Sequence, residues 1–183
     1  MAKQGSFKKH RLVRSAIRED VLYFAIPALL IYTAGLVISA VDGYDGLVVL
    51  IRSLVMQPAS LLVLTVQNII GVALFVGGMT IALVAVFTLR RCYSSTLMIR
   101  HDHQLITHGV YRYTRHPIYL GVIIAIMGIP VFVSSLYGLL TLSALIPIFI
   151  IRIRIEERML SDEFGDAYRI YKETTRKLIP FIY

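Results

Sequence analysis

The densest group of charged side chains able to do chemistry lies in residues 151–157. Arg152 and Glu156 are four residues apart, so on a helix they share one face, with Glu157 one step round. A carboxylate there can pair with a cationic ligand, and an arginine can hold an anionic ligand through two parallel hydrogen bonds. A plain ion pair between Arg152 and Glu156 is the alternative that spacing leaves open.

Histidines concentrate in one polar stretch, residues 92–117, which glycine and polarity mark as a loop: His101, His103, His108 and His116. Imidazoles can ligate a metal, but this spacing fits no zinc template, and Asp102 is the only carboxylate beside them. Cys92 is the only cysteine, which excludes paired thiols. We therefore expect no metal site.

Within this stretch, Arg115-His116-Pro117-Ile118-Tyr119 is the most informative run. Proline in the first turn of a helix fixes where the helix begins, and His116 and Tyr119 flank that point. A helix N-terminus can receive a carboxylate or a phosphate. A helix cap without any further function stays open as the simpler interpretation.

The elements that position these side chains must be membrane helices. Of 183 residues, 57% are hydrophobic and 16% are charged, whereas soluble proteins carry about 25% charged residues. A span needs about 20 apolar residues, so four or five spans would fill most of the chain. No Gly-x-Gly-x-x-Gly motif follows a strand, which argues against a soluble dinucleotide-type cofactor fold.

The first apolar run covers residues 21–41 and is too long for the apolar region of a signal peptide, so we expect it to remain as a span. Pro27 and Gly35 within it are tolerated when neighbouring helices repair the backbone. The sequence Asp42-Gly43-Tyr44-Asp45-Gly46 follows. It predicts a turn, because glycine readily supplies a positive φ.

Residues 47–60 are apolar but contain Arg52, which is costly at the centre of a bilayer, so they predict an interfacial helix. Residues 61–89 would form a helix of about 43 Å, longer than the ~30 Å hydrocarbon core. We expect the span to begin near Gln67-Asn68. Small residues inside it would let another helix approach closely: Gly71, Gly77 and Gly78.

Two shorter apolar helices follow, at residues 118–133 and 136–151, separated only by Ser134-Ser135. This pattern predicts a tight hairpin whose helices are marginal for crossing the bilayer. The second helix should continue through the charged residues 151–157 and leave the membrane. An amphipathic segment then runs to Tyr183.

The net charge of +8 comes from basic residues placed beside the apolar runs. This distribution is typical of the sidedness of a membrane protein rather than of a nucleic-acid surface, so no nucleic-acid partner is expected. Basic residues number six before the first span, five from Arg90 to Arg115 and seven from Arg152 to Lys177, while the Asp42/Asp45 turn has none. Four spans place the three basic segments on one side, which is then cytoplasmic along with both termini. A fifth span at residues 47–64 would separate them.

The fold class expected is therefore all-α: a polytopic integral membrane helix bundle of about four transmembrane helices. An interfacial helix and a cytoplasmic C-terminal amphipathic helix complete it. The chain divides into a basic segment at residues 1–20, N-terminal membrane helices at 21–95, and a third region at 96–183 that holds the candidate chemistry.

Several motifs of that third region occur in a recognisable order: Gly109-Val110-Tyr111, Arg115-His116-Pro117-x-Tyr119, Glu156-Glu157, Phe164-Gly165-x-x-Tyr168-x-x-Tyr171 and Pro180-Phe181-Ile182. This pattern resembles the isoprenylcysteine carboxyl methyltransferase family over residues 96–183. Phospholipid N-methyltransferases share the Arg-His-Pro and Glu-Glu elements, and membrane sterol reductases share Arg-His-Pro-x-Tyr and the terminal Pro-x-Ile. The resemblance thus implies a fold more firmly than a substrate.

By this resemblance the cofactor is S-adenosylmethionine, and Arg152 is a substrate-side arginine. Thr96 stands where relatives can place a glutamine. The cofactor contacts that the resemblance implies are His103, Gln104, Leu105, Ile106, Tyr111, His116, Tyr119, Glu156 and Glu157.

The function implied by the resemblance is methyl transfer to a lipophilic acceptor in the bilayer, with a carboxylate as the acceptor expected first. The bilayer and this acceptor are the expected partners. A carboxylate acceptor is already ionised at pH 7 and needs no general base. An amine or thiol acceptor must lose a proton, with His116, Glu157 or Tyr119 as a base. Transfer to a phospholipid amine or a thiol, an NADPH-dependent sterol-type reductase and a non-enzymatic scaffold remain as alternatives.

Overall fold

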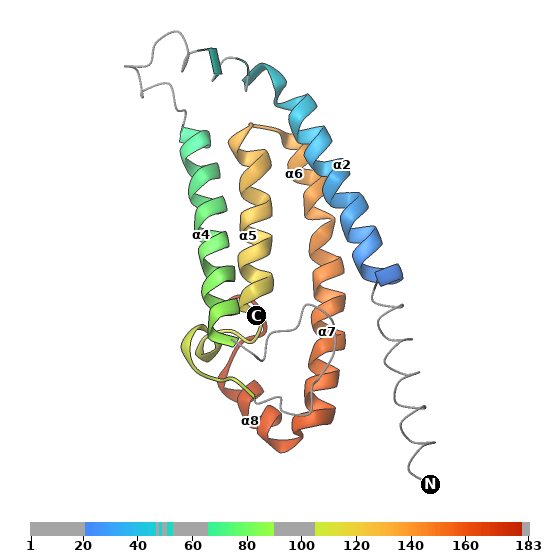
Figure 1. The fold of residues 1–183 in the computed structure, drawn as a ribbon, viewed down its shortest axis with the longest axis vertical. Coiled ribbons are helices and arrows are strands. Elements are labelled where there is room, and N and C mark those ends of the chain that lie inside the picture. Colours follow the sequence, from blue (N-terminus) through green and yellow to red (C-terminus); the bar gives the residue numbers. More distant parts are fainter. Residues whose placement is uncertain (1–20, 47, 49–50, 53–65, 90–104, 181–183) are drawn as a thin grey trace.

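A computed structural model describes residues 21–46, 48, 51–52, 66–89 and 105–180, and these contain helices and no strand. Three elements are short: a π-helical turn η1 (Val21–Ala25), a 3₁₀ turn η4 (Gly109–Arg112) and helix α6 (Leu136–Ser143). Figure 1 shows how they join the longer helices, which are α2 (Ile26–Asp42), α4 (Val66–Leu89), α5 (Pro117–Phe132), α7 (Leu145–Phe164) and α8 (Asp166–Thr174).

Three stretches are long and apolar enough to cross a membrane, at Leu22–Asp42, Val66–Leu89 and Leu136–Phe164. Helix α5 lies between α4 and the α6–α7 rod (Figure 1) and is also apolar, but its 16 residues reach only about 24 Å. The expectation of an all-α membrane helix bundle is confirmed, with three helical stretches long enough to span and α5 as a shorter apolar helix beside them. The predicted interfacial helix falls mostly outside the described residues.

Helices α4 and α5 pack through small residues at backbone distance. A Cβ added to Gly121 would lie 2.5 Å from the carbonyl oxygen of Gly78, and one added to Gly128 would lie 2.6 Å from the nitrogen of Phe75. Gly71 and Gly78 of α4 both face α5, as expected, but a Cβ on Gly77 would meet nothing within 4 Å. The prediction for Gly77 was therefore wrong, because its position turns it away from α5.

The turn predicted after the first span is present, but for a different reason. Helix α2 ends at Asp42, yet Gly43 has φ −89° rather than a positive value, and residues 44–46 form another helical turn. Glycine is needed at position 43 because an added Cβ would lie 2.5 Å from the carbonyl oxygen of Val133. A close approach of two segments, not backbone conformation, selects this glycine.

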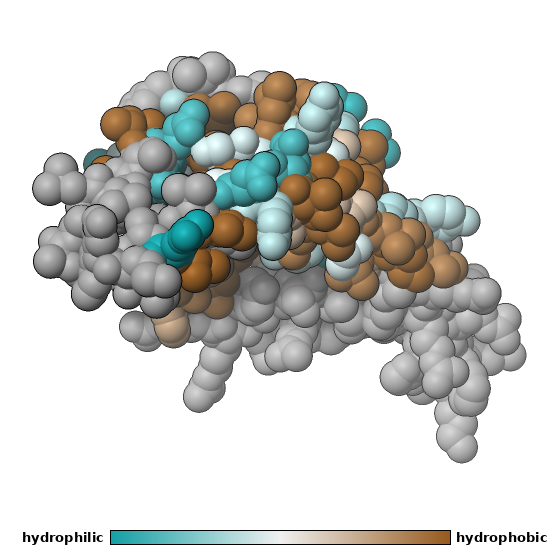
Figure 2. All heavy atoms as spheres, turned by 90° about the horizontal axis from the view of Figure 1, so that it is seen from above, coloured by the Kyte–Doolittle hydropathy of each residue, from teal (hydrophilic) through white to brown (hydrophobic). Residues whose placement is uncertain are grey.

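Polar side chains close this end of the bundle. Asp42 accepts a hydrogen bond from the Ser135 hydroxyl at 2.7 Å, and Asn68 donates to the carbonyl oxygen of Phe132 at 2.6 Å. Seen from this end, hydrophilic side chains lie among hydrophobic ones (Figure 2). The predicted hairpin at Ser134-Ser135 is confirmed, and Ser134 adopts the positive φ of 59° at its tip.

The opposite end carries the polar segments. Helix α7 continues the hairpin well past residue 151, α8 turns back beneath it, and the segment from residue 105 to the start of α5 lies close by (Figure 1). An isolated parallel bridge joins Thr114 to Arg176. Segments from three parts of the chain therefore meet where the candidate side chains lie.

Candidate active site

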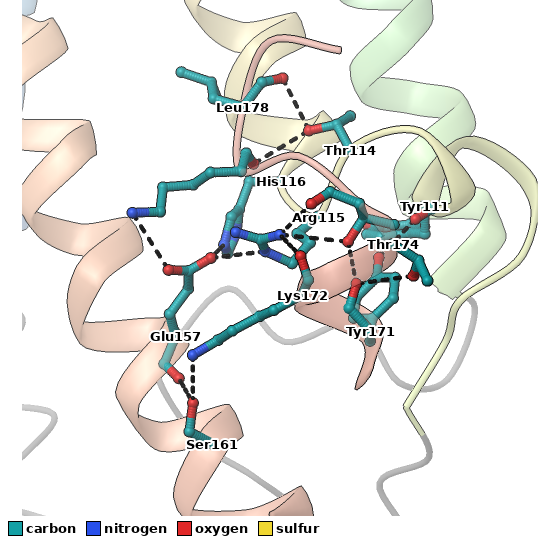
Figure 3. A network of polar contacts seen from close by, with 12 residues as sticks. Tyr111, Thr114, Arg115, His116, Glu157, Ser161, Tyr171, Lys172, Thr174 and Leu178 are labelled. Atoms are coloured by element: carbon teal, nitrogen blue, oxygen red, sulfur yellow. Dashed lines mark hydrogen bonds and ion pairs between the residues drawn. The ribbon is translucent and has the colours of Figure 1, made fainter. Parts of the chain in front are cut away.

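Glu157 lies at the centre of a buried charge cluster built from three segments. Its Oε1 accepts a hydrogen bond from Arg115 Nε at 2.9 Å and lies 3.5 Å from His116 Nε2, while its Oε2 lies 3.5 Å from Lys177 Nζ. The side chains of Arg115 and Glu157 are 9% and 11% exposed. Figure 3 shows these groups converging on the carboxylate from the segment before α5 and from the segment after α8.

Arg115 also holds the segment that follows α8. One of its terminal nitrogens donates to the carbonyl oxygen of Thr175 at 2.6 Å and to that of Lys172 at 3.2 Å. Carbonyls at the end of a helix lack partners inside the helix, and Arg115 satisfies them here. The arginine of the Arg-His-Pro run therefore joins α7 to the end of α8.

A second set of contacts ties the same segment to residues 111–114. The Thr114 hydroxyl donates to the carbonyl oxygen of Leu178 at 2.8 Å, and Tyr171 donates its hydroxyl to the carbonyl oxygen of Tyr111 at 2.6 Å. Burial raises the pKa of the Tyr171 phenol, which keeps the phenol protonated and able to donate. We call residues 171–178 the strap, because they cross and fasten the segment that leads into α5.

The second polar group is a hydrogen-bonded chain that runs from α7 to α5 and back. Arg152 Nε donates to the hydroxyl of Tyr119 at 3.0 Å, and that hydroxyl donates to Glu156 Oε2 at 2.8 Å. Arg152 and Glu156 share one face of α7, as predicted, and the Tyr119 hydroxyl connects them. The arrangement is thus more specific than an exposed ion pair along one helix.

Aromatic rings surround this chain. The Arg152 guanidinium lies 4.2 Å from the ring centre of Phe24, which comes from η1. Phe149 is 6.1 Å from Phe24 and 5.9 Å from Tyr119 between ring centres. Arg152 is only 8% exposed, so its charge is held among rings rather than in solvent.

The structure brings most of the predicted site residues together. Helix α5 begins at Pro117, as expected, and the His116 side chain makes no capping hydrogen bond but approaches Glu157, which weakens the simple cap interpretation. Leu105 and Ile106 are half-buried, while His103 and Gln104 lie outside the described residues. The groups that meet at this end of the bundle are Tyr111, His116, Tyr119, Arg152, Glu156 and Glu157.

The sequence prediction gave no role to several residues that build the site. Arg115 lies in a motif that was recognised, and its place beside His116 was a usable signal. Phe24 sits in a continuous apolar run, where nothing local distinguishes it from a lipid-facing side chain. No group of three or more His, Cys, Asp or Glu side chains suited to a metal occurs among the described residues.

Both the sequence and the fold of this protein match known proteins. The sequence model of the isoprenylcysteine carboxyl methyltransferase (ICMT) family matches residues 69–162, which takes in α4 as well as the charged part of α7. A solved eukaryotic intramembrane Ras methyltransferase ICMT superposes with a TM-score of 0.68 at 28% identity, covering 82% of this chain and 52% of that one.

Curated relatives carry two kinds of name. Methanethiol S-methyltransferase 1 of Bradyrhizobium diazoefficiens is 38% identical over 49% of this chain and 37% of its own length. Protein-S-isoprenylcysteine O-methyltransferase A of Arabidopsis thaliana is 31% identical over 61% of this chain and 58% of its own length. The chain thus spans less than two thirds of the length of either relative. Because the family model covers more than half of the chain, the protein belongs to the isoprenylcysteine carboxyl methyltransferase family.

Proposed function

We propose that this protein transfers a methyl group from S-adenosylmethionine to a lipophilic carboxylate at the membrane surface. The single observation that carries the proposal is the chain from Arg152 through Tyr119 to Glu156. It places a cation suited to an anionic acceptor next to a carboxylate suited to a cationic cofactor group. Relatives named for O-methylation of isoprenylcysteine support this assignment.

The donor set fits this cofactor. Glu156 is half-buried, and within the described residues its Oε1 accepts no hydrogen bond, so the carboxylate can accept one from an ammonium. Leu105 and Ile106 are half-buried and apolar, as a flank for adenine requires. When bound, S-adenosylmethionine supplies an electrophilic methyl on a sulfonium. The protein then has to hold the acceptor in line and exclude water.

The acceptor is argued from Arg152. An arginine that is 8% exposed and held on two sides suits a carboxylate through its planar fork and would repel a cationic amine. A carboxylate is already ionised at pH 7, so no residue has to remove a proton. A thiol is the second candidate, because a relative is named for S-methylation of methanethiol.

Calorimetric binding of S-adenosylhomocysteine to the purified full chain tests the cofactor assignment. Glu156→Gln removes a charge at constant volume and should weaken binding by about 10- to 150-fold, the loss of one charge-assisted hydrogen bond. Glu163→Gln, an exposed position on the same helix, is the matched control and should bind like wild type. Equal affinities of the two variants, or binding of NADPH in place of S-adenosylhomocysteine, would contradict the assignment.

Turnover of Arg152→Lys tests the acceptor assignment. Lysine keeps the charge but loses the fork, so turnover with a lipophilic carboxylate should fall by ~10- to 100-fold, while affinity for S-adenosylhomocysteine stays near wild type. The assay compares an S-prenylated N-acetylcysteine with methanethiol. Methylation of the thiol alone would replace the carboxylate by the thiol as acceptor.

We further propose that the end of the bundle holding Arg152 faces the cytoplasm, since the basic residues of segments 112–115 and 152–177 lie at that end. Single cysteines introduced as Asp45→Cys and Glu163→Cys, both in a Cys92→Ser background, report the two ends. An impermeant maleimide should reach position 163 only from the cytoplasmic side and position 45 only from the other side. Labelling of both from one side would contradict this orientation.

A further inference from the structure

We propose that Phe24 is a positioning residue for Arg152, so that one side chain of η1 supports the acceptor site. This inference rests on the proposed function, in which Arg152 orients the acceptor. Phe24 lies outside residues 69–162, the region that the family model matches. The first membrane helix would then contribute to selectivity rather than only anchor the chain.

The contact is close and desolvated. The Arg152 guanidinium lies 4.2 Å from the Phe24 ring centre, well inside the ~6 Å over which a cation is attracted to an aromatic face. Arg152 is 8% exposed, and such contacts strengthen when water is removed. Phe24 itself is half-buried, while its neighbour Tyr23 is 79% exposed.

Among the described residues, two aromatic side chains contact the guanidinium. Its Nε donates a hydrogen bond to the Tyr119 hydroxyl at 3.0 Å, and its central carbon lies over the Phe24 ring at 4.2 Å from the ring centre. Phe149 packs between the two aromatic residues and holds them at their separation. Phe24 has no polar atom, so its ring attracts the guanidinium charge while the N–H donors of Arg152 stay available for hydrogen bonds.

The local backbone explains why Phe24 can reach this position. Pro27 has no N–H, so the carbonyl of Tyr23 lacks the usual donor four residues on, and the chain forms a π-helical turn at Val21–Ala25 before α2 begins. Wide turns of this kind often occur at functional sites. The turn changes the direction of Phe24 relative to a continuous α-helix.

Kinetics of three variants test the proposal. Phe24→Leu removes the ring and should lower kcat/KM for the prenylated carboxylate by about 3- to 30-fold, with unchanged affinity for S-adenosylhomocysteine. Phe24→Tyr keeps an aromatic ring at this position and should retain the wild-type rate. Tyr23→Leu, in the same turn, should also match wild type. The loss from Phe24→Leu should also shrink in an Arg152→Lys background, because the two residues act together.

A binding measurement gives a readout besides activity. The chain has no tryptophan, so Phe24→Trp introduces a single tryptophan at the ring position, which can be excited selectively over the tyrosines. Its emission should change on addition of the S-prenylated N-acetylcysteine and much less with the methyl ester of the same compound, which lacks the anion. The change should also diminish in the Arg152→Lys background.

The outcomes separate the two proposals. A wild-type protein that binds no S-adenosylhomocysteine contradicts the proposed function, and the fluorescence comparison still tests the contact with the acceptor. A wild-type protein that methylates the acceptor while Phe24→Leu retains its full kcat/KM overturns the role of Phe24. Equal fluorescence responses to the acid and the ester overturn it as well.

Discussion

The α4–α5 interface and the cluster around Glu157 are held together by different forces. In the first, Gly78 and Gly121 bring two backbones into contact within the apolar part of the bundle. In the second, Glu157, Arg115 and Lys177 bind segments through charge. Within lipid there is no hydrophobic driving force for helices to associate, because the lipid tails are as apolar as the side chains. Close packing of small residues therefore has to hold α4 and α5 together. The bundle is therefore sensitive to side-chain size, and the candidate site is sensitive to charge.

The largest expected effect comes from removing the central charge of the cluster. Glu157→Gln removes the counter-charge of Arg115, whose side chain is only 9% exposed, and should lower the free energy of unfolding by about 3–5 kcal/mol. Denaturation of the purified protein in detergent micelles measures it. Asp166→Asn, which breaks an ion pair with Arg169 whose side chains are 72% and 85% exposed, is the control and should cost about 0–1 kcal/mol. Similar losses in the free energy of unfolding of both variants would show that burial of the cluster adds nothing to its contribution to stability.

The next effect tests side-chain size at constant charge. Gly78→Ala should destabilise the protein by about 1–3 kcal/mol, because the new methyl group would meet the backbone of Ala125 and Gly121. Gly77→Ala is its matched control one residue away, where an added Cβ meets nothing within 4 Å, and it should be neutral or stabilising by up to about 1 kcal/mol. Thermal denaturation of both variants measures the difference. If Gly77→Ala were the less stable variant, a different face of α4 from the one described would pack against α5.

The smallest effect concerns a neutral hydrogen bond between residues 111–114 and the strap. Thr114→Val keeps the shape of the side chain but removes its bonds to the carbonyl oxygens of Leu178 and Lys177, which should cost about 0.5–1.5 kcal/mol. Thr33→Val is the control, because that hydroxyl bonds only carbonyls of its own helix at an exposed position. Proteolysis within the strap should become faster in the Thr114 variant. An unchanged rate would mean that charge alone fastens the strap.

The sequence was sufficient for features that depend on local pattern. Apolar runs predicted the spans, and Pro117 predicted the start of α5, because proline constrains its own turn. Features that depend on packing could not be predicted from the sequence. The choice between Gly77 and Gly78 needs the rotation of α4 about its axis, and the connection of Tyr119 to Arg152 and Glu156 joins residues more than thirty positions apart.

The same distinction holds for single residues that the prediction misjudged or missed. Gly43 was explained by backbone conformation, whereas its neighbour in space, Val133, is ninety residues away in sequence and left no local signal. Phe24 is one aromatic residue in an apolar run, and only the folded bundle brings it to Arg152. Chemistry-bearing residue types could be found from the sequence, but the apolar residues that orient them could not.

The strap also has a consequence for the order in which the protein is made. The Thr114 hydroxyl finds its acceptor 64 residues later, at Leu178, and Arg115 finds Thr175 after 60 residues. Chains emerge N-terminal part first, so α4 and α5 can insert and pair while the strap is still unsynthesised. A nascent chain halted before residue 171 would therefore hold paired membrane helices but an unfinished site. The proposed methyl transfer would then require that the strap has been synthesised and has left the ribosome.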